Sequence, residues 1–188
     1  TNYSETVFTN FHYGKDAGDA YVQGTRKLIR NDAPIIGHYN VNDEGSGDMY
    51  YKGGNLIHYI RQLFDDDEKF RASLRKLNSL LYHKTTTSDE VEKFFSNELK
   101  IDLQPLFDQY LRNTQIPTLE IVRNKKELKY RWTDCLKSFN IPVRIYINET
   151  PKWIFPSTEW KSLSQNTPID QIKADKNFYV GWREENIN

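Results

Sequence analysis

The spacing of apolar residues changes once along this chain of 188 residues, and the change limits the folds that the chain can adopt. Before Ile116-Pro117, apolar residues recur at intervals of three and four, the spacing of one face of a helix. After it they alternate with polar residues, as in a strand that is covered on one face. We therefore predict an α+β fold, with a helical domain over residues 1–115 and a small antiparallel β-sandwich domain over residues 116–188.

The best amphipathic pattern of the helical part begins at Asp48, which, like Ser46, can cap a helix. The apolar residues at helical spacing are Met49, Leu56, Ile57, Ile60, Leu63 and Phe64. Four of them define the predicted buried stripe: Met49, Leu56, Ile60 and Leu63. Tyr50 lies on the first turn, so we expect its hydroxyl to project past the packed layer.

Other segments of the first part also have helical spacing. One runs from Asp16 to Arg30 and carries Ala20, Tyr21 and Leu28. Another is expected to start at Asp66 or Asp67. Thr87 and Glu90 have the spacing of a capping box, and a last short helix is expected after Asp102. Because the connections are short, neighbouring helices should pack antiparallel.

The strands are predicted from alternation. Leu119 and Ile121 alternate with polar residues, and a turn at Asn124 to Lys126 leads to a second alternating run that ends at Trp132. The cleanest alternation is formed by Ile141, Val143, Ile145 and Ile147. Further strands are expected from Lys152 to Phe155 and from Phe178 to Trp182.

Composition excludes several classes of function. Lysine plus arginine and aspartate plus glutamate both number 26, which predicts no broad electrostatic surface for nucleic acid or anionic membrane. No apolar run approaches the ~18 residues that span a bilayer. Cys135 is the single cysteine, which excludes an intrachain disulfide and an all-cysteine metal site. The compartment stays open, since a secreted protein can also lack disulfides.

Common site motifs are incomplete in this sequence. The four histidines are too scattered to form an i, i+4 pair, so no zinc ligand is predicted among them. The acidic run from Asp65 to Glu68 lacks the glycine and the glutamate of a calcium loop. Gly45-Ser46-Gly47 is too short for a phosphate loop.

The run Gly47-Asp48-Met49-Tyr50-Tyr51-Lys52-Gly53-Gly54 has a tyrosine two residues ahead of a Lys-Gly pair. Tyr-x-Lys-Gly at the start of a helix resembles a segment of the gluzincin zinc aminopeptidases, the family of aminopeptidase N and leukotriene hydrolase. In that family the tyrosine hydroxyl helps to stabilise the tetrahedral intermediate of peptide hydrolysis. The resemblance therefore implies that Tyr50 is catalytic and that Tyr51 is not.

The likeness extends over nearly the whole chain and implies that its helical part belongs to a thermolysin-like catalytic domain. Thr1 to Glu5 resembles the stretch just after the family's third zinc ligand, and Thr85 to Leu99 resembles a later helix. Phe107 to Leu111 resembles the exit into the family's β-domain. Tyr110 stands where tryptophan is common, a departure that falls at a structural junction.

The family's H-E-x-x-H zinc motif is absent from these residues. The resemblance implies a C-terminal fragment, beginning just after the third zinc ligand, of a zinc aminopeptidase that removes N-terminal residues from peptide substrates. Helical spacing that begins at once at Tyr3 and Val7 also suggests a chain cut within an element. Zinc is expected in the parent enzyme, with none bound by this chain, which alone should be inactive. Glu5, two helical turns beyond the missing ligand, is expected to support the metal site from outside its ligand set.

Two functions of other classes stay open from the sequence. One is a non-catalytic helical protein-interaction module, and the other is a β-sandwich domain that binds through exposed tryptophans. Tyr50 can also be an interfacial tyrosine that only packs near a helix start. An H-E-x-x-H motif upstream in the natural gene would favour the enzyme, and its absence would favour a binding role.

Overall fold

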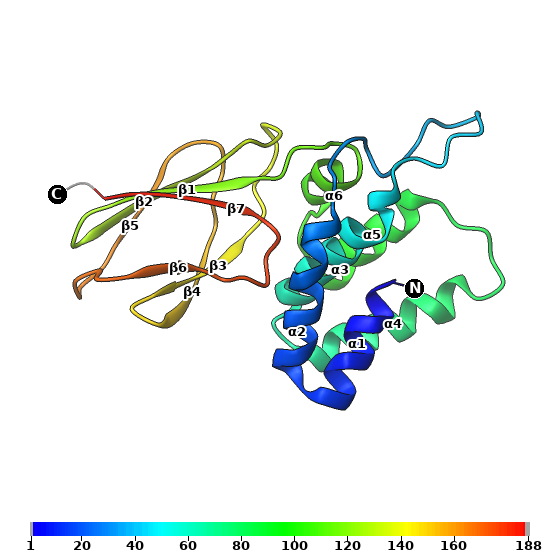
Figure 1. Cartoon of the computed structure of the whole chain (residues 1–188), viewed down its shortest axis with the longest axis horizontal. Helices are drawn as coiled ribbons and strands as arrows, with labels where there is room; N and C mark the ends of the chain where they lie inside the picture. The colour runs from blue at the N-terminus through cyan, green and yellow to red at the C-terminus, as the bar shows by residue number, and fades with distance from the viewer. Residues whose placement is uncertain (1, 187–188) are drawn as a thin grey trace.

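The computed structural model describes residues 2–186, except for the side chain of Asn186. Helices form one half of the molecule and strands the other, with the C-terminus at the far end of the strands (Figure 1). The predicted α+β fold class is confirmed. Thr1, the first residue of the predicted family resemblance, lies outside the described residues.

The central helix is α3, which contacts each of the other five α-helices. The α-helices are α1 (Asn2–Tyr13), α2 (Lys15–Gly24), α3 (Tyr51–Phe64), α4 (Asp67–Leu81), α5 (Ser88–Leu99) and α6 (Gln104–Leu111). Two 3₁₀ helices, η1 (Thr25–Leu28) and η2 (Gly47–Met49), flank the long loop before α3. Among the described residues, no helix is long and apolar enough to cross a membrane.

The predicted caps explain where two of these helices begin. Asp66 accepts hydrogen bonds from the first N–H groups of α4, and Thr87 and Glu90 form the predicted capping box of α5. At α6, the Asp102 carboxylate accepts from the Gln104 N–H at 3.0 Å. These side chains satisfy backbone donors that a helix start leaves without an intrahelical partner.

The strands form two sheets that face each other (Figure 1). One has the order β5-β2-β1-β7, formed by β5 (Lys161–Ser164), β2 (Glu127–Thr133), β1 (Thr118–Arg123) and β7 (Gly181–Asn186). The other has the order β4-β3-β6, formed by β4 (Thr150–Ile154), β3 (Val143–Ile147) and β6 (Ile172–Ala174). Strands β1 and β7 are parallel, so the prediction of a wholly antiparallel sandwich is wrong at this pair. Alternation is the same in both chain directions and cannot predict strand direction.

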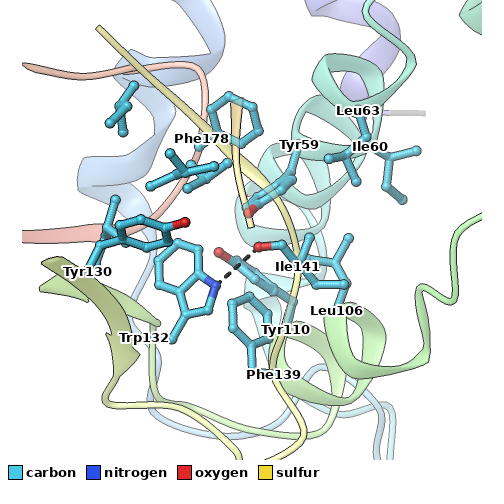
Figure 2. Packing of buried hydrophobic residues seen from close by; sticks show 14 of the residues in the cluster. Tyr59, Ile60, Leu63, Leu106, Tyr110, Tyr130, Trp132, Phe139, Ile141 and Phe178 are labelled. Atoms are coloured by element: carbon cyan, nitrogen blue, oxygen red, sulfur yellow. Dashed lines mark hydrogen bonds between the residues drawn. The ribbon is translucent and has the colours of Figure 1, made fainter. Parts of the chain in front are cut away.

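One cluster of buried side chains runs from the helices into the sandwich. Figure 2 shows Tyr59 and Tyr110 of the helices beside Trp132 and Phe178 of the strand half. The Trp132 indole N–H donates to the Ile141 carbonyl oxygen at 3.1 Å, and the rings of Tyr59 and Phe178 meet edge to face at 4.7 Å. This aromatic layer joins the two halves without a gap in the apolar core.

The segment from Asp16 to Arg30 differs from its prediction. It forms α2 and then η1, and Ala20, Tyr21 and Leu28 are exposed. The buried residues of α2 are Gly18, Asp19 and Val22. The reason is the close approach of α1, since a Cβ on Gly18 would lie 2.7 Å from the Asn10 Cβ. A packing face with a glycine, an aspartate and a single valine has no repeating apolar pattern to predict it.

The start of α3 also differs from its prediction. Hydrogen bonds from the Met49 N–H to the Ser46 carbonyl and from the Tyr50 N–H to the Gly47 carbonyl close three-residue turns. The predicted first turn is therefore the 3₁₀ helix η2, and α3 begins at Tyr51. Met49, predicted in the buried stripe, is 38% exposed because it precedes the helix.

The prediction of the sandwich missed β5 and β6 and placed the start of the last strand too early. Both missed strands are short edge strands, and β5 alternates only between polar residues and Leu163. Phe178 and Tyr179 precede β7, which begins at Gly181. Edge strands carry a weaker apolar pattern than central ones because they are less covered.

Candidate functional site

Tyr50 lies between η2 and α3, with backbone angles in the right-handed helical region. Its carbonyl oxygen accepts the first hydrogen bond of the helix, from the Gly54 N–H at 2.9 Å. Its surface is 56% exposed, and within residues 2–186 no side-chain hydrogen bond involves its hydroxyl. Tyr50 therefore presents an unused hydrogen-bond donor at the end of a helix.

The residue two positions before Tyr50 connects the turn η2 to the preceding loop by hydrogen bonds. Asp48 is 3% exposed, and its carboxylate accepts from the backbone N–H of Arg30 at 2.9 Å and of Asn31 at 2.6 Å. The Asp48 N–H in turn donates a hydrogen bond to the Ser46 hydroxyl oxygen at 3.2 Å. Together these hydrogen bonds join the turn before α3 to residues 30 and 31 and restrict its movement.

The residue two positions after Tyr50 connects the start of α3 to the segment between α6 and β1. Lys52 has no exposed surface, and its ammonium group donates to the Asn113 carbonyl oxygen at 2.8 Å, between α6 and β1. Burial lowers the pKa of Lys52, and nearby Asp48 opposes that shift. Tyr50 is therefore exposed, but the residues two positions before and after it, Asp48 and Lys52, are buried and bind the backbone of other segments.

A pocket of about 370 Å³ opens beside Tyr50, between the starts of α1 and α3 and the helices α5 and α6. Its size falls in the range of ~300–1,000 Å³ that is usual for small-molecule sites. Tyr50 and Gly53 line it together with an apolar group that includes Leu56, Ile57, Val91, Phe95, Phe107 and Leu111. The free hydroxyl of Tyr50 thus belongs to a residue that borders an apolar pocket.

One acidic residue lines the same pocket. Glu92 is 3% exposed, and both of its oxygens are bound by Arg112, at 2.7 and 3.2 Å. Gln104 donates a further hydrogen bond to Glu92 at 3.3 Å. The hydrogen bond from Arg112 to Glu92 raises the pKa of Arg112. Because its charge is compensated, Glu92 does not make the pocket acidic.

Glu5, the second site residue predicted from the sequence, is exposed on α1 and does not line the pocket. Its carboxylate accepts a hydrogen bond of 2.5 Å from the Tyr21 hydroxyl, and this bond raises the pKa of Tyr21. The structure therefore does not bring Glu5 and Tyr50 to one pocket. A role of Glu5 beside a metal site stays a prediction.

A buried polar group beneath α1 was not predicted. His58 has no exposed surface, and its Nδ1 lies 2.9 Å from the Tyr3 hydroxyl while its Nε2 lies 3.1 Å from Asn177 Oδ1. Burial lowers the pKa of His58 to about 4. The available signal was a polar stripe on α3, in which Asn55, His58 and Gln62 recur at helical spacing beside the apolar stripe.

The described residues do not supply a set of metal ligands. Within residues 2–186, no three His, Cys, Asp or Glu side chains form a group that could hold a metal ion. The described residues therefore do not form a site for the zinc that the family resemblance implies.

Comparison with known proteins identifies the fold. No protein-family model and no curated protein match the chain. Among solved structures, the chain is similar to Legionella pneumophila aminopeptidase A in complex with aspartic acid, with a TM-score of 0.70 and 13% sequence identity. The match covers 98% of this chain and 23% of the Legionella chain. The chain thus has the fold of about a quarter of that aminopeptidase.

Proposed function

We propose that this chain is part of a gluzincin zinc aminopeptidase, which removes N-terminal residues from peptides. The observation that carries the proposal is Tyr50, an exposed tyrosine with a free hydroxyl, attached on both sides and bordering an apolar pocket. The similarity of fold to an aminopeptidase supports it, as does the Tyr-x-Lys-Gly sequence at this position.

In this proposal the Tyr50 hydroxyl stabilises the transition state. Hydrolysis of a peptide bond builds negative charge on the former carbonyl oxygen, and a preorganised donor at that oxygen is worth ~10²–10³ in rate. The attachments of Asp48 and Lys52 hold the tyrosine in place before the substrate binds, so less reorganisation is needed at the moment of reaction.

Zinc, when bound in the parent enzyme, would polarise the carbonyl group and activate water. We propose that its ligands lie outside this chain, because residues 2–186 contain no group that could hold a metal ion. We place the general base outside the chain as well, because the H-E-x-x-H motif is absent from the sequence. The chain spans 23% of the Legionella enzyme, so the substrates and the metal of the whole protein belong to this proposal. We further propose that residues 1–115 and 116–188 are its helical domain and its sandwich domain.

A specific observation favours one alternative, a helical protein-interaction module. On α1, Phe8, Phe11 and Tyr13 are 59%, 83% and 73% exposed. Clustered exposed aromatic side chains mark surfaces that bind other proteins. This alternative predicts no hydrolysis of peptides.

Peptide hydrolysis by the full-length protein distinguishes the two functions. We expect release of the first residue from alanyl peptides with a free N-terminus and no cleavage of the same peptides after N-acetylation. The 188-residue chain alone should cleave neither and should not bind zinc more tightly than about micromolar in equilibrium dialysis, because that affinity requires several convergent ligands. A full-length protein that hydrolyses neither peptide would contradict the proposed function.

A further inference from the structure

A second hollow, of about 220 Å³, lies where the helical half of the molecule meets the sandwich. Three of its lining residues belong to the helical half and three to the strand half: Leu63, Asp65, Ile101, Pro142, Trp153 and Phe155. It shares none of them with the pocket beside Tyr50. Sites for small molecules are common at such junctions, and a hollow below the usual ~300–1,000 Å³ suits a ligand with a single ring.

The wall of this hollow is apolar except at one residue. Leu63 and Pro142 are buried, whereas Phe155, directly after β4, is 59% exposed. A large aromatic side chain therefore lies open to solvent beside residues that the core already covers. Covering its ring with the apolar part of a ligand is favourable, because it removes apolar surface from water.

The exception is Asp65, the only ionisable residue among the described residues that line the hollow. Its side chain is 58% exposed, and its Oδ2 accepts from the indole N–H of Trp153 at 3.4 Å, which places the carboxylate beside a ring of the wall. Its Oδ1 accepts from the Arg144 guanidinium at 2.9 Å. A carboxylate has about four acceptor positions, so these two donors leave room for a third.

Arg144 does not neutralise Asp65, because it is shared with a second acid. Its Nε donates to Asp175 at 2.7 Å, and Asp175 is 4% exposed. One guanidinium between two carboxylates leaves one negative charge, and Asp65 is the acid that solvent can reach. The ammonium group of Lys161 donates to the Phe155 carbonyl oxygen at 2.6 Å, but Lys161 does not line the hollow. The charge at the hollow therefore favours a cation and disfavours an anion.

The two aromatic residues favour the same kind of ligand. The faces of the Trp153 and Phe155 rings carry a partial negative charge and attract an ammonium group, while their apolar surface attracts its hydrocarbon part. We propose that this hollow binds an organic ammonium ion that carries one aromatic ring, with its positive charge beside Asp65 and its ring against the apolar wall. The site does not depend on the proposed function.

Binding of 2-phenylethylammonium to the 188-residue chain, followed by NMR, tests the site. We expect saturable shifts of the Trp153 indole N–H and the Ile101 backbone N–H at millimolar concentration, without shifts of the indole N–H groups of Trp160 and Trp182. Two further probes each lack one feature, since 2-phenylethanol has no charge and ethylammonium has no ring. Each should bind at least ~3-fold more weakly, because each loses one attraction.

Asp65→Asn tests the carboxylate. Asparagine tolerates the left-handed backbone of residue 65, whose φ is 49°, so the variant should fold. It should weaken binding of 2-phenylethylammonium at least ~3-fold and leave 2-phenylethanol unaffected. Asp134→Asn is the matched control, because Asp134 also has a left-handed backbone, with φ 53°, and a side chain that is 51% exposed, but does not line the hollow. It should keep wild-type affinity.

Phe155→Ala tests the aromatic wall. It should weaken both ring-containing probes at least ~3-fold, whereas Phe11→Ala, which removes an exposed ring on α1, should weaken neither. The proposal would be overturned if 2-phenylethylammonium gave no saturable shift below ~50 mM in wild type. Equal affinity of wild type for 2-phenylethanol, or an Asp65→Asn variant that binds no worse than Asp134→Asn, would overturn it as well. None of these measurements needs catalysis, so such results leave the proposed function intact.

Discussion

Tyr50, just before α3, and Tyr59, in the second half of α3, have opposite environments. Tyr59, at the junction with the sandwich, has no exposed surface and donates its hydroxyl to the Pro142 carbonyl oxygen at 3.0 Å. Tyr110 of α6 is equally buried and donates to the Tyr179 carbonyl oxygen. Burial raises the pKa of both hydroxyls well above the usual value of 10.0. Tyr50, at the start of α3, is 56% exposed, and its hydroxyl has no partner among the described residues.

This difference in exposure and hydrogen bonding indicates that Tyr59 and Tyr110 are structural, whereas the Tyr50 hydroxyl is available to bind a ligand. At the junction, ring area and hydroxyl both contribute to a closed core, so nothing is left to contact a ligand. At the start of α3, the neighbours of Tyr50 are buried while its own hydroxyl stays free. Stability should therefore depend on the junction with the sandwich, and activity on the start of α3.

The largest expected effect on stability is at the junction. Trp132→Ala removes a side chain that is 1% exposed and leaves the Ile141 carbonyl without its indole donor. We expect a loss of about 3–5 kcal/mol in the free energy of unfolding, measured by urea denaturation.

Trp160→Ala is the matched control, because that tryptophan is 42% exposed and the Arg131 guanidinium lies over its ring. It should cost no more than about 1 kcal/mol. Equal losses in the two variants would contradict a core that is closed at the junction.

The buried histidine should make stability depend on pH. His58 has a folded pKa of about 4 against an ordinary 6.5, because burial disfavours its charged form more than the nearby Asp19 favours it. Below pH 6.5 the unfolded chain binds a proton that the folded chain does not, so stability is complete above pH 6.5 and falls as pH drops toward about 4. The loss should reach roughly 3 kcal/mol.

Urea denaturation at several pH values between 4 and 7.5 measures this effect, and His58→Gln is the comparison. The variant keeps a polar side chain in the group formed with Tyr3 and Asn177 but cannot be protonated. It should lose the part of the pH dependence that lies below pH 6.5. An identical dependence in both proteins would show that other groups cause it.

At the start of α3, the hydrogen bond of Lys52 that holds the segment around Tyr50 should affect kcat. Lys52→Met keeps an unbranched side chain, one heavy atom shorter, but removes the hydrogen bond to the Asn113 carbonyl oxygen. In the full-length protein we expect kcat to fall by up to ~10²-fold, because a displaced catalytic group loses its alignment. In the double variant with Tyr50→Phe the two losses should not add, since both act through one hydroxyl. Additive losses would separate Lys52 from Tyr50.

The smallest expected effect concerns Glu5. If its carboxylate supports the metal site, Glu5→Gln should lower zinc affinity or activity of the full-length protein by ~10-fold or more. Tyr21→Phe provides a control, because it removes only the hydrogen bond that Glu5 accepts on the surface of α1. Wild-type zinc affinity and rate in Glu5→Gln would reduce Glu5 to a surface residue.

Sequence patterns predicted the parts of the fold in which one physical signal dominates. The capping box of Thr87 and Glu90 and the alternation of Leu128, Tyr130 and Trp132 are local, and both are found in the structure. The face of α2 was missed because it packs through Gly18 and Asp19, which carry no apolar signal.

The candidate site was predictable only in part. Tyr-x-Lys-Gly singled out Tyr50, and the structure adds the pocket that it borders. The attachments of Asp48 to Arg30 and of Lys52 to Asn113 join residues far apart in the sequence, which spacing rules do not relate. The same limit hid the group around His58, whose partner Asn177 lies in the sandwich half. The catalytic roles of Tyr50 and Glu5 and the domain boundary at residue 115 stay predictions.

The kinetics of Tyr50→Phe beside Tyr51→Phe in the full-length protein test the central claim most directly. The first variant removes the free hydroxyl of Tyr50 and keeps its ring, and the second does the same at a neighbouring helix position that points ~100° away. We predict a fall in kcat of ~10²-fold or more for Tyr50→Phe with a smaller change in KM, the pattern of a bond made chiefly in the transition state. Tyr51→Phe should stay within a few-fold of wild type. Equal losses in both variants, or no loss in Tyr50→Phe, would contradict the account.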